Sequence, residues 1–390
     1  MKNVQKQVPS ILILIALVGF PQISESIFTP VLPAISRTLS VTAQTSQLTM
    51  GSYFVGFAIG VLVWGRLSDG IGRRPAMLWG IAVYLFGNFA LWLAPNFKVL
   101  MFARVLQAFG AASGSVITQT IMRESFSGVE GERVFAKISA AMALAPALGP
   151  LIGGALATYF GNYRFVFVGL MVMAGSLWFY VLWRLPETRI TMPEVSPWPQ
   201  VAVQMLRSPQ VWGYGLLISG INGILFSYYA EAPFIFEQHF GMSTVQYGWL
   251  GLLIAGSSIL GALITNYTAG KLAPNKLISY GLLIAVLGAC GMWLAAENLI
   301  ASLLMIFIMF GGIYTALPLV LNRALIGFEA VIGTASGLLS FGYYLLISAL
   351  TLLMSAMHDG SVLALPKYVL LVGVLMLIAD RLLVNHESRR

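Results

Sequence analysis

Three ionisable side chains lie inside long apolar stretches of this chain, where an unpaired charge is costly. Glu25 and Glu231 are acidic, and Arg104 is basic. Burial in an apolar medium favours the neutral form of a carboxyl group, so both glutamates are candidates to bind and release protons near neutral pH. A buried guanidinium must be paired or face water, so Arg104 either lines a polar cavity or extends to the membrane surface. Positions at the membrane interface are also the alternative for the two glutamates.

The composition indicates that a bilayer surrounds these residues. Of the 390 residues, 58% are hydrophobic and 9% are charged, which lies far from the usage of soluble domains. The apolar runs suit helical spans of about 20 residues, and the short alternating segments of a membrane barrel are absent from the sequence. The excess of 22 basic over 14 acidic residues fits the positive-inside rule, so we expect no nucleic-acid partner. The sequence predicts an all-α integral membrane protein.

Twelve apolar runs predict twelve transmembrane helices. Their approximate bounds are 8–35, 43–66, 75–94, 98–122, 134–160, 163–184, 210–236, 244–270, 276–295, 298–322, 329–357 and 363–384. A polar connection rich in proline follows the sixth run. It divides the chain into an N-terminal six-helix bundle (1–185), a cytoplasmic linker (186–209) and a C-terminal six-helix bundle (210–390). With both termini in the cytoplasm, most Lys and Arg residues lie inside, as the positive-inside rule requires.

The two halves contain matching glycines. The segment 51–67 aligns with 256–272 so that glycines coincide at three positions. In this alignment, Gly-Arg-Leu of the first segment corresponds to Gly-Lys-Leu of the second. Chance agreement is the alternative, since glycine is common in membrane helices, but the shared spacing favours an internal duplication. Glu25 and Glu231 are separated by nearly the same interval, which predicts that they face each other across a central cavity. Two pseudo-symmetric bundles around such a cavity suggest alternating access.

The stretch GRLSDGIGRRP at 65–75 concentrates charge and helix breakers between two apolar runs. We expect a short cytoplasmic loop in which the glycines allow a tight reversal and Pro75 occupies the first turn of the next helix. Arg73 and Arg74 serve at least as orientation signals. Acidic residues contribute little to orientation, so Asp69 indicates a more specific role for this loop.

A second cluster of small residues and prolines lies in the fifth predicted helix, ALAPALGPLIGG at 143–154. Gly149 and Gly153 are four residues apart and form a small face for close helix packing. Pro146 and Pro150 each remove an internal hydrogen bond and bend the helix. Close packing together with a bend suits a helix that moves, although ordinary helix packing would use the same glycines.

These motifs resemble those of a known family. GRLSDGIGRRP is similar to the loop signature of the major facilitator superfamily, RVLQAFGAA (104–112) resembles its helix-four motif, and residues 143–154 resemble the helix-five motif of its drug:proton antiporters. PVLP (30–33) and YYAEAPFIFEQHFGMS (228–243) resemble the Bcr/CflA multidrug efflux group. The positions that carry the first and third motifs are Gly65, Asp69, Gly72, Arg73 and Arg74, and Pro146, Gly149, Pro150, Gly153 and Gly154.

The resemblance implies the major facilitator fold, with twelve transmembrane helices in two pseudo-symmetric six-helix bundles, and roles for individual residues. Asp69 and Arg73 would form a conformational latch, whose contacts with neighbouring helices exist in the outward-open state and are released in the inward-open state. Arg104 would tune the proton affinity of a carboxylate in the translocation path. One departure concerns helix one, where the acid that the family often carries aligns with Ser26. Glu25 is therefore rotated by about 100° around the helix.

We therefore expect a proton-coupled secondary active transporter that exports small lipophilic or cationic compounds by alternating access. The proton is the expected coupling ion, with no other cofactor, and the expected partners are the small-molecule substrate and membrane lipids. The residues expected to line the substrate cavity are Tyr53, Phe57, Gln107, Asn222, Tyr228 and Tyr229, several of which offer aromatic faces to cations. We expect a functional monomer in the bacterial inner membrane. The alternatives are an exporter of one endogenous metabolite or siderophore, a proton symporter for uptake, and a receptor that transports nothing.

The remaining reactive residue types point to no further chemistry. Cys290 lies in an apolar run and is expected to be a buried, inert thiol. His239, His358 and His386 fall in predicted loops or the tail and lack the spacing of a metal site. No nucleophile–base pair and no phosphate-binding loop are recognisable in the sequence, so we expect neither an enzyme nor an ATP-driven pump.

Overall fold

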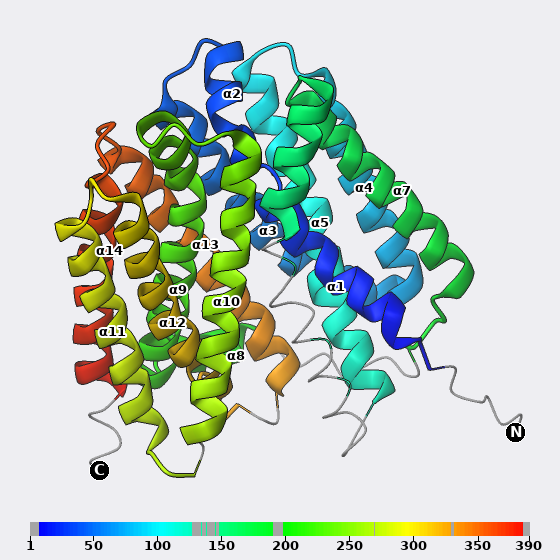
Figure 1. Ribbon diagram of the computed structural model, residues 1–390. Helices are drawn as coiled ribbons and strands as arrows, with labels where there is room; N and C mark the ends of the chain where they lie inside the picture. The colour runs from blue at the N-terminus through cyan, green and yellow to red at the C-terminus, as the bar shows by residue number, and fades with distance from the viewer. Residues whose placement is uncertain are drawn as a thin grey trace, which may run out of the picture.

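The computed structural model is a bundle of long helices (Figure 1). It describes residues 8–126, 134, 138, 145, 148–189, 198–268, 270–328 and 331–384. Across these ranges the chain forms helices and connecting turns, without a strand. The predicted all-α class is confirmed.

The helices follow the order of the predicted spans. They are α1 (Ile11–Ser26), η1 (Thr29–Val31), α2 (Leu32–Thr38), α3 (Ala43–Ile71), α4 (Arg73–Leu93), α5 (Phe97–Ser125), α7 (Arg164–Arg184), α8 (Trp198–Leu206), α9 (Pro209–Pro233), η2 (Phe234–His239), α10 (Thr244–Thr268), α11 (Pro274–Leu294), α12 (Leu299–Arg323), α13 (Ile332–Met357), α14 (Ala364–Ala379) and η4 (Asp380–Val384). Among the described residues, 10 helices are long and apolar enough to cross a membrane. A shorter helix, Leu148–Phe160, lies in the predicted fifth span, much of which falls outside the described residues, and α14 with η4 occupies the twelfth.

Polar caps explain where several long helices begin. The side chains of Ser10, Thr42, Asn96 and Asn298 each accept a hydrogen bond from a backbone N–H in the first turn of the helix that follows. Each cap satisfies one of the N–H groups that have no partner inside the helix. The apolar runs therefore become helices with defined starting points.

The helices pack in two groups that correspond to the two halves of the chain. α5 packs against α1, α3 and α4 in the first group, and α12 packs against α10 and α11 in the second. A Cβ on Gly56 of α3 would overlap the carbonyl of Val105 in α5, and one on Gly261 of α10 would lie 2.7 Å from the carbonyl carbon of Tyr314 in α12. The matched pair Gly56 and Gly261 thus allows the same close approach in both halves.

The two halves meet mainly along α3 and α13. In Figure 1, α2 and the connection from α13 to α14 lie at the upper end of the molecule, and α8 lies at the lower end. The Ser348 hydroxyl of α13 donates to the carbonyl of Gly51, in the upper part of α3, at 2.8 Å. The hydroxyls of Tyr247 and Thr29 lie 3.5 Å apart, also near the upper end. Within the described ranges, the hydrogen bonds between the halves lie toward the upper end, which is therefore closed.

The charged stretch 65–75 is mostly helical, so the expectation of a loop is wrong. α3 continues through Gly65 and Gly70 to Ile71, and α4 begins at Arg73. The reversal is confined to Gly72, whose φ of 105° is strained for residues with a side chain. Hydrogen bonds from the Arg73 side chain back to the last turns of α3 make a longer loop unnecessary.

Two other features differ from expectation. Cys290 is exposed on α11 rather than buried, because a helix that is apolar all round does not identify its packed face by hydrophobicity alone. The predicted linker contains the short helix α8, whose Val201 and Met205 pack with Val211 of α9 and Ala335 of α13.

Candidate functional site

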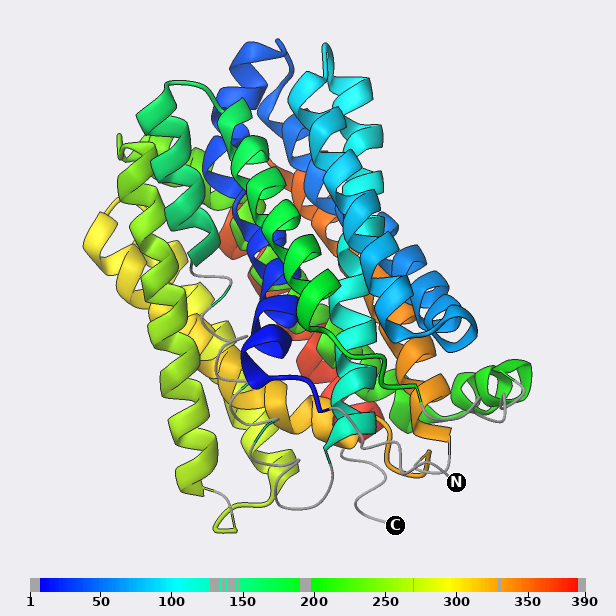
Figure 2. The ribbon, with the colours of Figure 1, turned by 90° about the vertical axis from the view of Figure 1, so that its right-hand side faces the viewer.

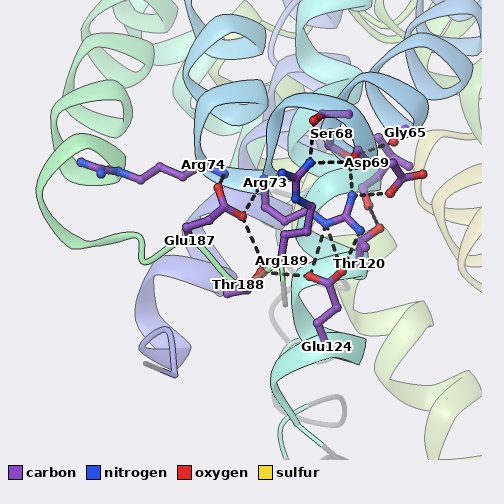
Figure 3. A network of polar contacts seen from close by, with 12 residues as sticks. Gly65, Ser68, Asp69, Arg73, Arg74, Thr120, Glu124, Glu187, Thr188 and Arg189 are labelled. Atoms are coloured by element: carbon purple, nitrogen blue, oxygen red, sulfur yellow. Dashed lines mark hydrogen bonds and ion pairs between the residues drawn. The ribbon is translucent and has the colours of Figure 1, made fainter. Parts of the chain in front are cut away.

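Arg73 is the centre of a polar network at the lower end of the first half (Figure 3). Its side chain is only 3% exposed. Arg73 Nη1 donates to Asp69 Oδ1 at 2.5 Å and to Ser68 Oγ at 2.8 Å, and Nη2 donates to Glu124 Oε1 at 2.6 Å. Asp69 is 46% exposed, so water screens its attraction, and the charge-assisted contacts of Arg73 Nε and Nη2 with the Glu124 carboxylate are the stronger ones. The network joins the end of α3, the start of α4 and the end of α5.

The segment after α7 completes this network from the other side. The Glu187 carboxylate accepts hydrogen bonds from the backbone N–H groups of Arg73 at 2.9 Å and Arg74 at 3.1 Å, which caps α4 with a negative charge. A Cβ on Gly72 would lie 2.6 Å from that carboxylate. Arg189 donates to the last carbonyl oxygens of α3. Gly72 is therefore required both by its backbone angle and by the approach of Glu187.

All five predicted latch positions lie in or beside this network; the fifth, Gly65, accepts a hydrogen bond from Ser68 at 2.8 Å. Sequence analysis missed Glu124, Glu187 and Arg189. Their signal was a charge placed at the lower end of a predicted span or just after it, as for Asp69. Among the described residues, the contacts of the network join the first half and the start of the linker and none reaches the second half; the role of the network as a latch stays a prediction.

Replacing Arg73 by Lys should loosen the lower end of the first half. An ammonium group cannot reproduce the several hydrogen bonds that the planar guanidinium donates to Asp69, Ser68 and Glu124. We therefore expect the free energy of unfolding to fall by about 1–3 kcal/mol, a figure already reduced because solvent screens the partly exposed carboxylates. The thermal midpoint of the purified protein in detergent should fall by several degrees. Arg66→Lys is the matched control, because Arg66 is exposed on the same part of α3. Equal midpoints for the two variants would contradict the structural role assigned to Arg73.

Arg104 is buried without a carboxylate in hydrogen-bond contact. It is 0% exposed, donates to Gln107 through Nη1, and Gln107 in turn donates to Asn88 at 2.6 Å. The guanidinium lies 4.2 Å from the ring centre of Tyr53 and 4.5 Å from that of Phe28, a cation–π arrangement. Nε and Nη2 have no hydrogen-bond partner within the described part of the chain. Arg104 therefore does not extend to the membrane surface, and it keeps donors free in the interior.

Glu25 lies in α1 on the side that faces the second half of the chain. It is 2% exposed, and Oε1 has no hydrogen-bond partner among the described residues. The charges of Glu25 and Arg104 interact electrostatically, and the charge of Glu25 also reaches Tyr229 and Tyr344 of the second half. Glu25 thus stands between a buried cation and the aromatic side chains of the opposite bundle.

Glu231 has different neighbours from Glu25, and among the described residues no hydrogen bond or ion pair joins the two carboxylates. Glu231 is 1% exposed and accepts a hydrogen bond from Gln47 Nε2 at 2.6 Å. His358 Nδ1 lies 2.9 Å from both carboxylate oxygens. Sequence analysis placed His358 in a loop and gave Gln47 no role, because neither residue belongs to a recognisable motif.

Of the remaining residues expected in the substrate cavity, Phe57 contacts the opposite half, whereas Tyr228 and Asn222 make their contacts within the second half. Phe57 of α3 packs against Tyr344 of α13 with ring centres 4.6 Å apart. Tyr228 is buried and meets Phe310 edge-on at 5.2 Å. Asn222 is satisfied by the carbonyl oxygen of Ile218 in its own helix, at 2.9 Å. Phe57 and Tyr344 thus bring aromatic rings together between the halves, and contact of these residues with a substrate stays a prediction.

The described part of the helix-five motif packs between α1 and α10, as Figure 2 shows for Leu148–Phe160. A Cβ on Gly153 would overlap the carbonyl oxygen of Ile27, and a Cβ on Gly149 would overlap Ser26. On the other side, a Cβ on Gly154 would lie 2.7 Å from the carbonyl oxygen of Thr244. The glycines thus allow close approach to both halves, while Pro146 lies outside the described residues. Pro150 takes part in the same contact, because its carbonyl oxygen lies 2.9 Å from the Cβ position of Gly248.

Comparisons with known proteins agree with this architecture. The family model described as "Major Facilitator Superfamily" matches residues 14–379. An uncharacterized transporter of Rickettsia bellii is 33% identical over 366 residues, which cover 90% of each chain. The chloramphenicol resistance protein of Pseudomonas aeruginosa is 28% identical over 358 residues, which cover 90% of this chain and 84% of that protein.

A solved structure shows the same fold. The bacterial homolog of the human lysosomal transporter Spinster, in its inward-facing and occupied conformation, superposes with a TM-score of 0.75 at 16% sequence identity. The match covers 95% of this chain and 94% of that one. The predicted fold of two pseudo-symmetric six-helix bundles is confirmed.

Proposed function

This chain belongs to the Major Facilitator Superfamily of transporters, and we propose that it exports small lipophilic or cationic compounds in exchange for protons. The observation that carries this proposal is the buried Glu25, which interacts electrostatically with Arg104 of the first bundle and with Tyr229 and Tyr344 of the second. A carboxyl group with a free oxygen can bind a proton, and the nearby guanidinium favours its release. Proton and substrate would compete for the same space between the bundles.

The aromatic walls support a lipophilic substrate. Tyr53 and Tyr344 lie within electrostatic reach of Glu25, and Phe57 packs against both of their rings. Aromatic surfaces of this kind bind apolar compounds and cations without a demand for one shape. The chloramphenicol resistance protein of Pseudomonas aeruginosa is consistent with this class of substrate. Among the alternatives, a single polar metabolite would need more directed hydrogen-bonding groups than these rings supply.

The proposed orientation follows the positive-inside rule. The lower end carries the clustered charges Arg66, Arg73, Arg74 and Arg189 and would face the cytoplasm, with both termini inside. The upper end would face the outside of the bacterial inner membrane. The upper end is closed by contacts between the halves, as the inward-facing stage of the proposed cycle requires.

Proton movement in proteoliposomes tests the proposed function. The protein is reconstituted as a monomer, a pH gradient is imposed, and the internal pH is recorded while tetraphenylphosphonium or chloramphenicol is added. Antiport predicts that the added compound dissipates the gradient in proportion to its transport. A change of internal pH in the opposite direction would indicate symport for uptake. A gradient unaffected by either compound would reject broad export and favour a specific metabolite.

A further inference from the structure

His358 and Glu231 form a buried pair that connects the halves at the upper end. Glu231 comes from α9, and His358 follows directly after α13, so both belong to the second half. Gln47, in the first turns of α3, belongs to the first half. Its Nε2 donates to Glu231 Oε2 at 2.6 Å and lies 3.3 Å from His358 Nδ1. Opening of the upper end must separate Gln47 from the pair.

We propose that the Glu231–His358 pair is a proton-operated lock on the upper end, closed when the pair holds one proton and weakened when the proton leaves. The contacts require an N–H at Nδ1, because His358 Nδ1 lies 2.9 Å from both oxygens of Glu231. When the ring also carries its second proton, it is an imidazolium and the counter-ion of the buried carboxylate. With that proton, the ion pair leaves Glu231 Oε2 able to accept from Gln47. When the imidazolium loses that proton, the neutral imidazole can keep its N–H on Nδ1, but the buried carboxylate of the closed arrangement loses its counter-ion.

Protons can reach this pair from the upper side. Glu231 and His358 line a cavity of about 160 Å³, whose wall also includes His239 and Ser361. The His239 side chain is 39% exposed, and that of His358 is 11% exposed, so the cavity leads toward solvent. Glu231, at 1% exposure, lies at its inner end. A proton can thus reach the Glu231–His358 pair from the upper side without passing the lower end of the molecule.

The surroundings of His358 set the direction of its response to pH. The groups that face it are the carboxylates of Glu231 and Asp359, Lys367 paired with Asp359 at 3.5 Å, the neutral amide of Gln47, and His239 across the cavity, paired with Glu297 at 3.2 Å. The hydrogen bond to Glu231 raises the pKa of His358 above its ordinary value of 6.5, against the opposing effect of burial. The closed state is therefore fully stabilised below pH 6.5, and this stabilisation is lost as the pH rises through the raised value.

This lock adds a step to the proposed proton-driven export. The direction that we give to the step rests on that proposed function. An exporter driven by protons must close toward the outside after it takes up a proton there. A lock that closes on protonation supplies that step at the outer end, separately from Glu25 near the centre. Gln47 is the positioning residue that transmits the protonation state of the pair to the other half.

The distance between the halves at the upper end tests the lock without any transport. Spin labels are attached at Thr38→Cys in the first half and Leu294→Cys in the second, because both positions are exposed. The background carries Cys290→Ser, because the native cysteine is exposed and would also be labelled. Double electron–electron resonance is recorded in nanodiscs from pH 5 to pH 9. We expect the ratio of short to long distances to fall by up to about tenfold per pH unit above the ordinary pKa of histidine.

Variants separate the lock from a general effect of pH. His358→Gln should abolish the pH response, whereas His239→Gln, in the same cavity but paired with Glu297, should preserve it. Gln47→Ala leaves the pair intact and should lower the closed population at low pH, which tests the link between the halves should His358→Gln fail to fold. A constant distance ratio in the wild type, or a response that survives in His358→Gln, overturns the lock. A normal lock without compound-coupled proton flux would instead reject only the proposed function.

Discussion

Glu25→Gln is expected to abolish compound-driven proton movement while leaving the protein folded. The amide has nearly the shape of the carboxyl group but cannot exchange a proton, and Glu25 is buried beside Arg104 with one oxygen unpaired. Loss of the proton-exchanging group should lower coupled flux by about 100-fold or more. The measurement is the initial rate of pH-gradient dissipation in proteoliposomes after addition of tetraphenylphosphonium.

Binding and coupling are separated by a second measurement on the same variant. A neutral compound such as chloramphenicol should still bind to Glu25→Gln, with a change in affinity of less than about tenfold, because the aromatic walls are unchanged. Glu237→Gln is the matched control: this glutamate lies in η2 and contacts Thr244 rather than Arg104, so its coupled flux should remain close to that of the wild type. Full flux in Glu25→Gln would show that another group carries the proton.

Gly153→Ala should produce the second large effect, on the packing of the fifth helix. An added Cβ would overlap the backbone carbonyl oxygen of Ile27, and a backbone atom of α1 cannot move aside as the end of a flexible side chain can. We expect α1 to be displaced from this helix, with transport reduced by about tenfold or more and a thermal midpoint lower by about 5 °C. Coupled flux in proteoliposomes and thermal unfolding in detergent measure the two effects.

The control for this substitution is Gly175→Ala. Gly175 lies in α7, and a Cβ there would have no heavy atom within 4 Å, so the added methyl group should be tolerated or slightly stabilising. Similar losses of flux and thermal stability in Gly153→Ala and Gly175→Ala would indicate that alanine is poorly tolerated at glycine positions in general, and would contradict a specific effect at Gly153. Normal flux in Gly153→Ala would mean that α1 and the fifth helix need not approach so closely during the cycle.

The sequence by itself determined the class of the protein and the order of its helices. Apolar runs of sufficient length must be helical in a bilayer, because every backbone donor and acceptor has to be satisfied within the segment. The same argument identified Glu25 and Arg104 as costly intramembrane charges, and the structure buries both, which excludes the alternative of interfacial positions for them. The helix-five glycines were recognisable because close packing requires small residues at helical spacing.

Only the tertiary structure decided which of these residues meet. Arg73 contacts Glu124 of α5 and Glu187 of the segment after α7. Glu231 contacts Gln47 and His358 rather than Glu25. Hydrophobic periodicity carries little information in a membrane, since the lipid-facing side of a helix is as apolar as its packed side; for the same reason Cys290 was expected in the interior and lies on the surface. Partners separated by more than a hundred residues are set by how the helices cross, which depends on the summed packing of all of them and not on any local pattern.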